Sequence, residues 1–162
     1  MWWPCALSTQ AEWETALQNI ANGKRGVNAR DRHGRTLLHF AAADFGGLCT
    51  FARLLELGAH PSAHSRVFGL PMHSCAISKQ KDALDKCKLL PVADMWNKTH
   101  NAAITPFVAC VLCGNYDVLE YMLQQPECPV EAFLRDQLPR WNTYIELPKK
   151  TLLLETAARR QR

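Results

Sequence analysis

A short apolar motif recurs along this 162-residue chain at a nearly constant spacing. It reads GRTLLHFAA in its first copy, then GLPMHSCA, then ITPFVACV, and more weakly KTLLLETAA near the C-terminus. Aligned on Thr36, Leu70, Thr105 and Thr151, the copies lie 34, 35 and 46 residues apart. A period of this length is typical of repeat proteins, in which each unit buries its apolar face only by stacking on its neighbours. The chain is therefore predicted to be a row of similar units.

Each copy of the motif favours a short helix with a defined start. The hydroxyl groups of Thr36 and Thr105 are suited to accept a hydrogen bond from the free amide groups at a helix N-terminus. Pro71 and Pro106 stand at the first helical position, where a missing N–H group is tolerated. We therefore expect Thr36, Leu70 and Thr105 each to begin a helix, and these helices to stack side by side.

A second apolar stretch follows the motif and indicates a return helix in each unit. The stretch is FARLLELGAHPSA after the first copy and YDVLEYMLQQPECPVEA after the third. Gly58 suits a helix end that needs a left-handed residue, and Gly34 suits a tight turn before the next helix. The sequence thus predicts two helices in each unit.

In its period and its motif, the chain resembles the ankyrin repeat family, whose repeat is about 33 residues long with a T-P-L-H-x-A signature. The resemblance is best from Asp31 to Ala63 and good from Thr105 to Leu123. It implies an all-α solenoid of stacked helix pairs joined by hairpin loops. It also implies a single domain over residues 1–162, with a half repeat at 8–30, repeats at 31–64, 65–99 and 100–132, and a C-terminal insertion and partial repeat at 133–162.

The motif histidines His39 and His73 have two interpretations. A histidine on the first turn of a helix can act as a base or a metal ligand. In the family pattern, the imidazole instead bonds between the threonine and neighbouring backbone, and so locks the loop to the helix. We therefore expect His39 to be buried and bonded to hydroxyl or backbone groups, and we expect the same role for His73.

Other candidates for chemistry are few. Cys110 and Cys113 form a C-x-x-C pair, a spacing that can bind zinc or exchange disulfides, but no second pair has matching spacing. Cys110, like Cys75, falls at a small core position. His60 and His64 flank a turn, where solvated side chains are the simpler interpretation. We expect no catalytic residue, no metal ligand and no cofactor, and we do not expect an enzyme.

Basic residues concentrate in the segment GKRGVNARDRHGR, which leads into the first motif. In the repeat pattern they fall on a projecting hairpin, and a second group occupies the equivalent places one repeat later. Stacked units would align both groups into a basic stripe on the concave side, which favours an acidic partner and speeds its encounter. A merely solvated rim is the alternative. The residues of this predicted stripe are Arg30, Arg32, His33, Arg35, His64 and Arg66.

Aromatic residues mark both ends of the array. Trp2 and Trp3 precede the first expected helix, and the C-terminal insertion carries Trp141 and Tyr144. Aromatic side chains often carry most of the binding energy of an interface. The alternative is that these side chains cover the open ends of the stack. Both pairs are candidate partner-binding residues beside the basic stripe.

The composition, with 48% hydrophobic and 21% charged residues, is that of a soluble globular protein. No apolar run approaches 18 residues and the start does not resemble a secretory signal, so we expect no membrane span. An odd count of seven cysteines favours reduced thiols and an intracellular, cytoplasmic location. We expect a module that binds one or more proteins, as an adaptor or a subunit docked in a larger assembly. Nucleic-acid binding through the basic stripe is the alternative, which is disfavoured because aromatic residues do not alternate with the arginines.

Overall fold

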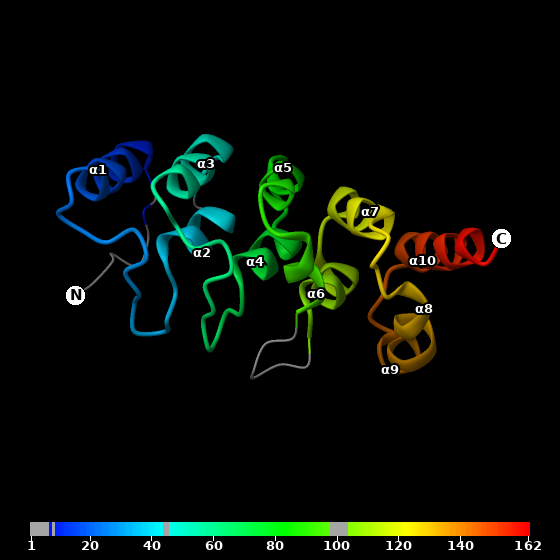
Figure 1. Ribbon diagram of the computed structural model, residues 1–162. Coiled ribbons are helices and arrows are strands. Elements are labelled where there is room, and N and C mark those ends of the chain that lie inside the picture. Colours follow the sequence, from blue (N-terminus) through cyan, green and yellow to red (C-terminus); the bar gives the residue numbers. More distant parts are fainter. Residues whose placement is uncertain (1–6, 8, 44–45, 98–103) are drawn as a thin grey trace.

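The computed structural model describes residue 7 and residues 9–43, 46–97 and 104–162, and these residues form helices and connecting loops. Figure 1 shows the helices standing in two rows, one above the other, along an elongated molecule. Within the described ranges, the one β-type contact is an isolated antiparallel bridge between Ser65 and Gly69. The expectation of an all-α chain is therefore confirmed for these residues.

The chain alternates between the two rows. The upper row in Figure 1 consists of α1 (Gln10–Ala21), α3 (Leu48–Glu56), α5 (Ala83–Lys88) and α7 (Tyr116–Gln124). The lower row begins with α2 (Leu37–Ala42), α4 (Pro71–Ile77) and α6 (Pro106–Cys113), and the short 3₁₀ helix η1 (Val92–Trp96) packs against α4 and α6. Each helix packs on the next one in its row, and each lower helix also packs on the upper helix that follows it in the chain.

The lower helices begin where the motif predicts. Thr36, Leu70 and Thr105 are the capping residues of α2, α4 and α6. The Thr105 hydroxyl accepts a hydrogen bond from the Val108 N–H group at 3.2 Å, which satisfies one free amide of the first turn. A proline occupies the first position of both α4 and α6. The prediction that these three helices stack side by side is confirmed.

The C-terminal part, for which the sequence predicts an insertion and a partial repeat, consists of short helical segments and one longer helix. It contains α8 (Val130–Ala132), the π-helical turn η2 (Phe133–Gln137), α9 (Leu138–Trp141) and α10 (Leu147–Arg160). The helix α10 begins after Glu146, so Thr151 lies inside it, and the Thr151 hydroxyl donates to the Leu147 carbonyl oxygen at 3.1 Å. The alignment of Thr151 with the capping threonines is wrong, because Pro148 in the first turn favours an earlier helix start.

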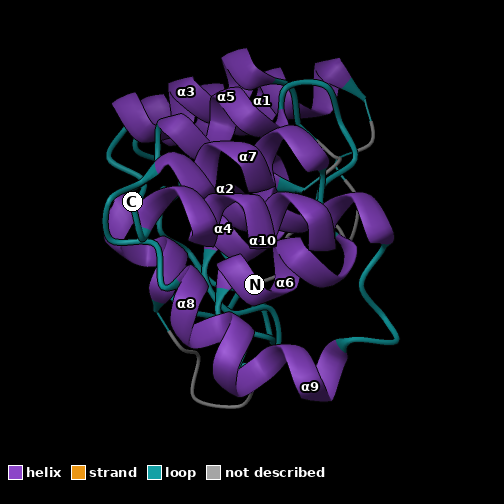
Figure 2. Cartoon of the chain, turned by 90° about the vertical axis from the view of Figure 1, so that its right-hand side faces the viewer, coloured by secondary structure: helices purple, strands orange, loops and turns teal. Residues whose placement is uncertain are grey.

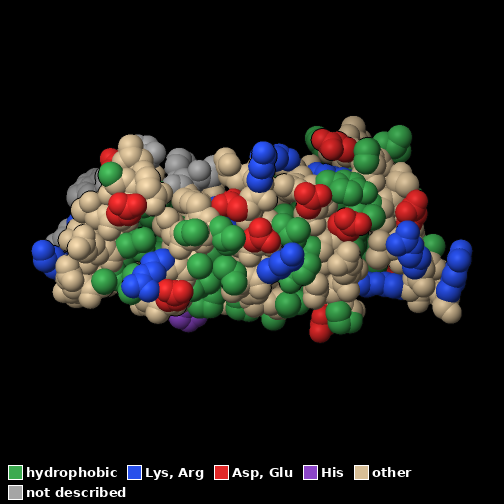
Figure 3. Space-filling view, turned by 90° about the horizontal axis from the view of Figure 1, so that it is seen from above, with side chains coloured by type: hydrophobic (Ala, Val, Ile, Leu, Met, Phe, Trp, Pro, Cys, Tyr) green, Lys and Arg blue, Asp and Glu red, His purple; other side chains and the backbone are tan. Residues whose placement is uncertain are grey.

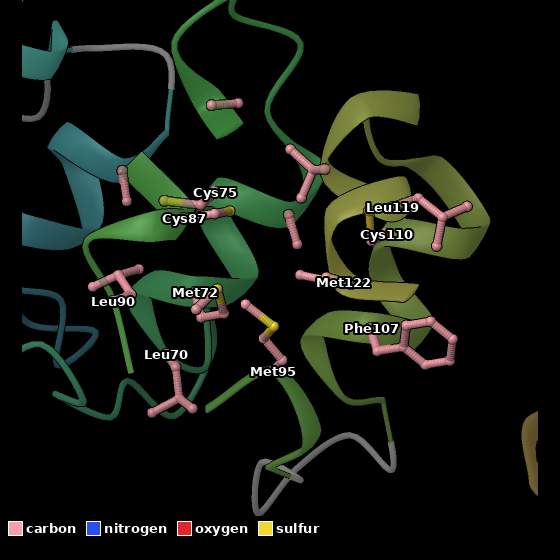
Figure 4. Packing of buried hydrophobic residues seen from close by; sticks show 14 of the residues in the cluster. Leu70, Met72, Cys75, Cys87, Leu90, Met95, Phe107, Cys110, Leu119 and Met122 are labelled. Atoms are coloured by element: carbon pink, nitrogen blue, oxygen red, sulfur yellow. The ribbon is translucent and has the colours of Figure 1, made fainter. Parts of the chain in front are cut away.

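One hydrophobic core lies between the rows and extends from α1 to α10. Trp13 and Leu153 are buried near its two ends. Figure 4 shows the middle of this core, where Cys75 of α4 and Cys87 of α5 lie close together, and Cys110 of α6 lies farther along the row. Cys75 and Cys110 are fully buried, as predicted for small core positions. Larger side chains at these positions would force the neighbouring helices apart.

Two basic side chains of α10 bind the ends of earlier helices. Lys149 is buried, and its Nζ donates to the carbonyl oxygen of Gly114 at 2.9 Å and to that of Cys110 at 3.4 Å. Arg160 donates to three carbonyl oxygens at and beyond the end of α7, of which the Leu123 oxygen lies at 2.9 Å. The last carbonyl groups of a helix lack partners within it, and cations there are stabilising. These contacts fix α10 against α6 and α7.

Candidate functional site

Two hairpin turns project below the lower row, one before α2 and one before α4 (Figure 1). In the first, the Asp31 carboxylate accepts hydrogen bonds from the backbone N–H groups of His33 at 2.9 Å and Arg35 at 2.8 Å. In the second, Ser65 and Gly69 exchange backbone hydrogen bonds of 2.7 and 3.0 Å. Each turn contains a glycine with positive φ, a conformation that favours this residue.

The two hairpins are joined to each other. Arg30 donates from Nη1 to the His64 carbonyl oxygen at 2.7 Å. The Ser65 hydroxyl donates to the His33 carbonyl oxygen at 2.8 Å. Contacts between backbone and side chain at both positions hold the second hairpin at a fixed distance from the first. The surface that the hairpins form is therefore built into the fold.

Each motif histidine joins its own helix to the start of the next unit. The Nδ1 atom of His39 accepts from the Thr36 N–H group at 3.1 Å, and its Nε2 lies 3.0 Å from the Gly69 carbonyl oxygen. His73 repeats the arrangement, with Leu70 N–H at 3.1 Å and the Ile104 carbonyl oxygen at 3.0 Å. A neutral ring with its proton on Nε2 satisfies both contacts. The predicted structural role is confirmed for both residues.

The environment of His39 opposes protonation. Burial removes water from the ring and, with the positive charges of Arg30 and Arg35 nearby, lowers the pKa of His39 to about 4, although the Gly69 carbonyl oxygen favours the proton. Burial also lowers the pKa of His73. Both imidazoles are therefore neutral near pH 7, which is the form that their hydrogen bonds require.

Five of the six residues of the predicted basic stripe lie together. They line a hollow of about 350 Å³ between the hairpins, together with Asp31, Gly34 and Val67. A second hollow of about 360 Å³ adjoins it and shares Arg30 and His64. The three arginines that line the hollow, Arg30, Arg32 and Arg66, are exposed. The five residues are Arg30, Arg32, His33, His64 and Arg66.

Arg35, the sixth residue of the predicted stripe, is turned away from this hollow and serves the hairpin itself. Its Nε lies 2.6 Å from Asp31 Oδ2, and its guanidinium carbon lies 4.4 Å from the ring centre of Phe40 and 4.6 Å from that of Phe68. Burial of Asp31 disfavours its charge, but hydrogen bonds from Arg35 and His33 outweigh burial and lower the pKa of Asp31. Arg35 thus holds the hairpin shape, with its charge largely paired.

Apolar side chains at the tip of the second hairpin were not predicted from the sequence. Val67 is 66% exposed and Phe68 is 43% exposed, and Val67 lines the same hollow as the basic residues. The signal in the sequence is the pair Val-Phe inside a turn, a position where large apolar side chains stay partly exposed to water. The basic residues and these two side chains form one surface, called the hairpin surface below: Arg30, Arg32, His33, His64, Arg66, Val67 and Phe68.

The aromatic residues expected to bind a partner at the two ends differ in their exposure, and the structure describes only those of the C-terminal end. Trp2 and Trp3 lie outside the described residues. Trp141 is half-buried against the core, and its Nε1 donates to the Gln137 side chain at 3.4 Å. Tyr144 is 70% exposed, with its ring 6.1 Å from that of Trp141. Figure 1 places α9 and α10 at the far end of the row from the two hairpins, so these aromatic residues and the hairpin surface are separate candidates.

The C-x-x-C pair is divided between the core and the surface. Burial raises the pKa of the Cys110 thiol to about 12, whereas Cys113 is exposed and donates to the Ala109 carbonyl oxygen at 3.3 Å. Among the residues that the structure describes, no group of three or more His, Cys, Asp or Glu side chains is arranged to hold a metal ion. The same residues contain no helix with the length and apolar character that a membrane span requires.

Neither the family models nor the curated proteins compared with this sequence give a match. The hairpin surface is the described region in which fixed backbone, clustered positive charge and exposed apolar side chains coincide. It can bind a carboxylate or phosphate group and an adjacent apolar side chain.

Proposed function

We propose that this chain is a non-catalytic protein-interaction module of the ankyrin-repeat type, acting as an adaptor or as a subunit docked in a larger assembly. The hairpin surface carries the proposal, because it joins basic groups around a hollow to the exposed side chains of Val67 and Phe68. The period of 34 and 35 residues and the alternation of helices between two rows support the repeat assignment.

Contacts that recur from one unit to the next support the same assignment. The bridge from His39 to Gly69 is repeated by the bridge from His73 to Ile104, at sequence separations of 30 and 31 residues. Repeat proteins depend on this kind of nearest-neighbour contact, since each unit is unstable alone. A rigid row of hairpins suits the binding of a partner without any change in the module.

The partner is a protein segment that is acidic and carries an apolar side chain. Arginine holds carboxylate and phosphate groups through paired, charge-assisted hydrogen bonds, and the exposed side chains of Arg32 and Arg66 line the hollow beside Arg30. Val67 and Phe68 supply apolar area beside these charges. The charges set the encounter rate and orientation, and the apolar contact supplies binding energy.

Nucleic-acid binding is the second candidate, favoured by the same basic cluster. It requires phosphate contacts in series and stacking aromatic rings. Phe68 is the aromatic residue of the hairpin surface, and its ring is already engaged by the guanidinium of Arg35. The six described cysteines are free thiols, which supports the further proposal that the chain works in a reducing, intracellular compartment such as the cytoplasm.

Affinity capture from native extract tests this proposal, with the purified chain as bait. Replacing Arg32 and Arg66 together by Glu should lower the retained protein about ten-fold or more, since hydrogen bonds to charged groups contribute about 1.5–3 kcal/mol each. Val67→Ser should weaken retention as well. The matched control reverses Arg53 and Lys88, which are exposed basic residues of the upper row.

Retention that survives the hairpin variants, with unchanged melting temperature, would exclude the hairpin surface as the binding site. Loss of retention after nuclease treatment of the extract would favour nucleic acid over protein. Both conclusions require that the control variant at Arg53 and Lys88 still retains the partner, because a general loss of positive charge weakens the binding of any acidic partner.

A further inference from the structure

The last helix, α10, has an apolar stripe on its outer face. Its inner face is buried through Lys149, Leu153 and Ala157. On the opposite face Leu147 is 74% exposed and Leu154 is 55% exposed. Thr151 and Ala158, at helical spacing from these leucines, are exposed too. An exposed apolar face on a helix invites association with another surface. Figure 2 looks along the row from this end, with α10 facing the viewer.

The first helix, α1, has a groove along one flank at the other end of the row. The groove has a volume of about 380 Å³ and is lined by Leu7, Ala11, Thr15, Ala16 and Asn19, with Glu12 and Arg25 also on its wall. Its floor is made of small side chains, which leaves room for larger ones from outside. From Ala11 to Asn19 the helix rises about 12 Å, and from Leu147 to Leu154 α10 rises about 10.5 Å, at 1.5 Å per residue. The groove therefore matches the stripe in length.

We propose that the stripe on α10 of one copy docks in the groove on α1 of a second copy, so that the chain associates head to tail. Leu147 and Leu154 are the side chains that enter the groove. The helix α1 carries Glu12 and Glu14 and no basic residue, whereas α10 carries four basic residues and one acidic residue. Figure 3 shows Lys and Arg side chains gathered at the right-hand end of the molecule, where α10 lies. The two ends thus differ in charge as well as in shape.

An antiparallel arrangement of the two helices makes the charges complementary. It brings Arg159, in the last turn of α10, to Glu12, in the first turn of α1. It also brings Glu146, the capping residue of α10, toward Arg25, which follows α1 and lines the groove. These pairs add to the contacts that Glu12 and Arg159 already make within their own chains. A parallel arrangement would instead bring Glu146 toward Glu12 and Arg159 toward Arg25, so the antiparallel arrangement is favoured.

The groove and the stripe lie at opposite ends of the row, so each copy carries one of each (Figure 1). Such an interface is heterologous, and it generates a ring or an open chain rather than a closed pair. The length of the assembly then depends on protein concentration. This property distinguishes the proposal from a symmetric dimer in which two α10 helices pack on each other.

Sedimentation of the full 162-residue chain over a hundred-fold concentration range tests the proposal. The weight-average mass of the native chain should rise well above the 18.3 kDa of one chain, and added salt should lower it. Thr15→Arg blocks the groove, and Leu154→Arg breaks the stripe. Each variant alone should remain at the mass of one chain, and an equimolar mixture should reach the mass of two chains and stop there. Leu89→Arg, at a leucine of similar exposure beyond α5, is the matched control and should associate as the native chain does.

Two results would overturn the proposal. One is a native chain that stays at the mass of one chain at all concentrations while its circular dichroism is that of a folded helical protein. The other is a Thr15→Arg variant that associates normally while Leu154→Arg does not, because this outcome assigns the contact to a symmetric α10 pair. The Leu154→Arg variant is also judged by its melting temperature, which should not change because this side chain is exposed.

Discussion

At the scale of single residues, two imidazoles join segments that lie about 30 residues apart in the sequence, His39 to Gly69 and His73 to Ile104. His39 uses both ring nitrogens, one toward its own helix start and one toward the Gly69 carbonyl oxygen. Because Nδ1 accepts a hydrogen bond from the Thr36 N–H group, a proton on this ring nitrogen would break that contact. The contact therefore exists only for the neutral ring, which links the stability of the fold to pH.

The stability of this protein should fall as the pH drops from 6.5 toward 4. The pKa of His39 is about 4 in the folded chain and 6.5 in the unfolded chain, so between these values the unfolded chain binds more protons. The contribution of His39 to the free energy of unfolding is fully present above pH 6.5. It is lost progressively as the pH falls below this value, by on the order of 3 kcal/mol in total. Urea unfolding from pH 7.5 to 4.5 measures this loss. His39→Gln should flatten the slope, and an equal slope in that variant would assign the pH dependence to other groups.

At the scale of the elements, the end of α6 is the most crowded junction of the stack. Gly114 follows this helix, and its carbonyl oxygen accepts from Lys149 at 2.9 Å and from Lys79 at 3.2 Å. A Cβ atom at Gly114 would lie 2.6 Å from Cys110 Cα and would also collide with the Ala76 carbonyl oxygen of α4. Glycine is needed here for close approach between α4 and α6.

Replacing Gly114 by Ala should therefore lower the free energy of unfolding by about 1–3 kcal/mol, since overpacking forces the backbone to move. Gly47→Ala is the control, because a Cβ there meets nothing within 4 Å and its backbone is extended. Chemical denaturation of both variants provides the comparison. Equal stability of the two would show that α4 and α6 can separate at no cost, contrary to the packing described.

Local signals in the sequence predict the helix starts. Contacts between residues distant in the sequence determine which side chains are buried and which way they point. The threonine caps and prolines locate α2, α4 and α6 because capping depends on neighbours in sequence. The motif aligned Thr151 with the capping threonines but predicted no helix start there, because the apolar pattern alone does not locate a first turn, and α10 begins at Leu147. The burial of Lys149 and the turning of Arg35 toward Phe40 and Phe68 both depend on tertiary neighbours. The sequence therefore located five of the basic residues around the hollow and missed the apolar tip.

At the scale of the whole molecule, α10 closes the row by binding two earlier helix ends. Lys149 binds the end of α6 and Arg160 binds the end of α7, at sequence separations of 35 and 37 residues. In a row of units that touch only their neighbours, loss of one contact is felt locally. The two ends of the molecule should therefore differ in their response to a change at Arg160.

Arg160→Ala should speed amide hydrogen exchange in α10 and at the end of α7, because three carbonyl oxygens lose a charged donor. Exchange in α2 and α4 should stay within about two-fold of the native rate, since these helices share no contact with Arg160. Hydrogen exchange followed by mass spectrometry resolves the two regions. Arg135→Ala is the control, because its exposed side chain pairs with Asp136 at the surface. An equal increase in the exchange rate along the whole chain would instead indicate that the molecule unfolds as one cooperative unit.

The histidine bridges also determine where the protein could be lengthened. The position of His39 and His73 is taken by Val108 in the third motif, so the series of bridges ends there. A tandem duplication of residues 36–69 would carry its own histidine and its own acceptor, because His39 and Gly69 both lie inside that segment. A unit added after α7 would have no equivalent histidine bridge, because Val108 stands at the histidine position of the third motif. We therefore expect a unit duplicated in the N-terminal half to be joined to its neighbours more firmly than one added in the C-terminal half.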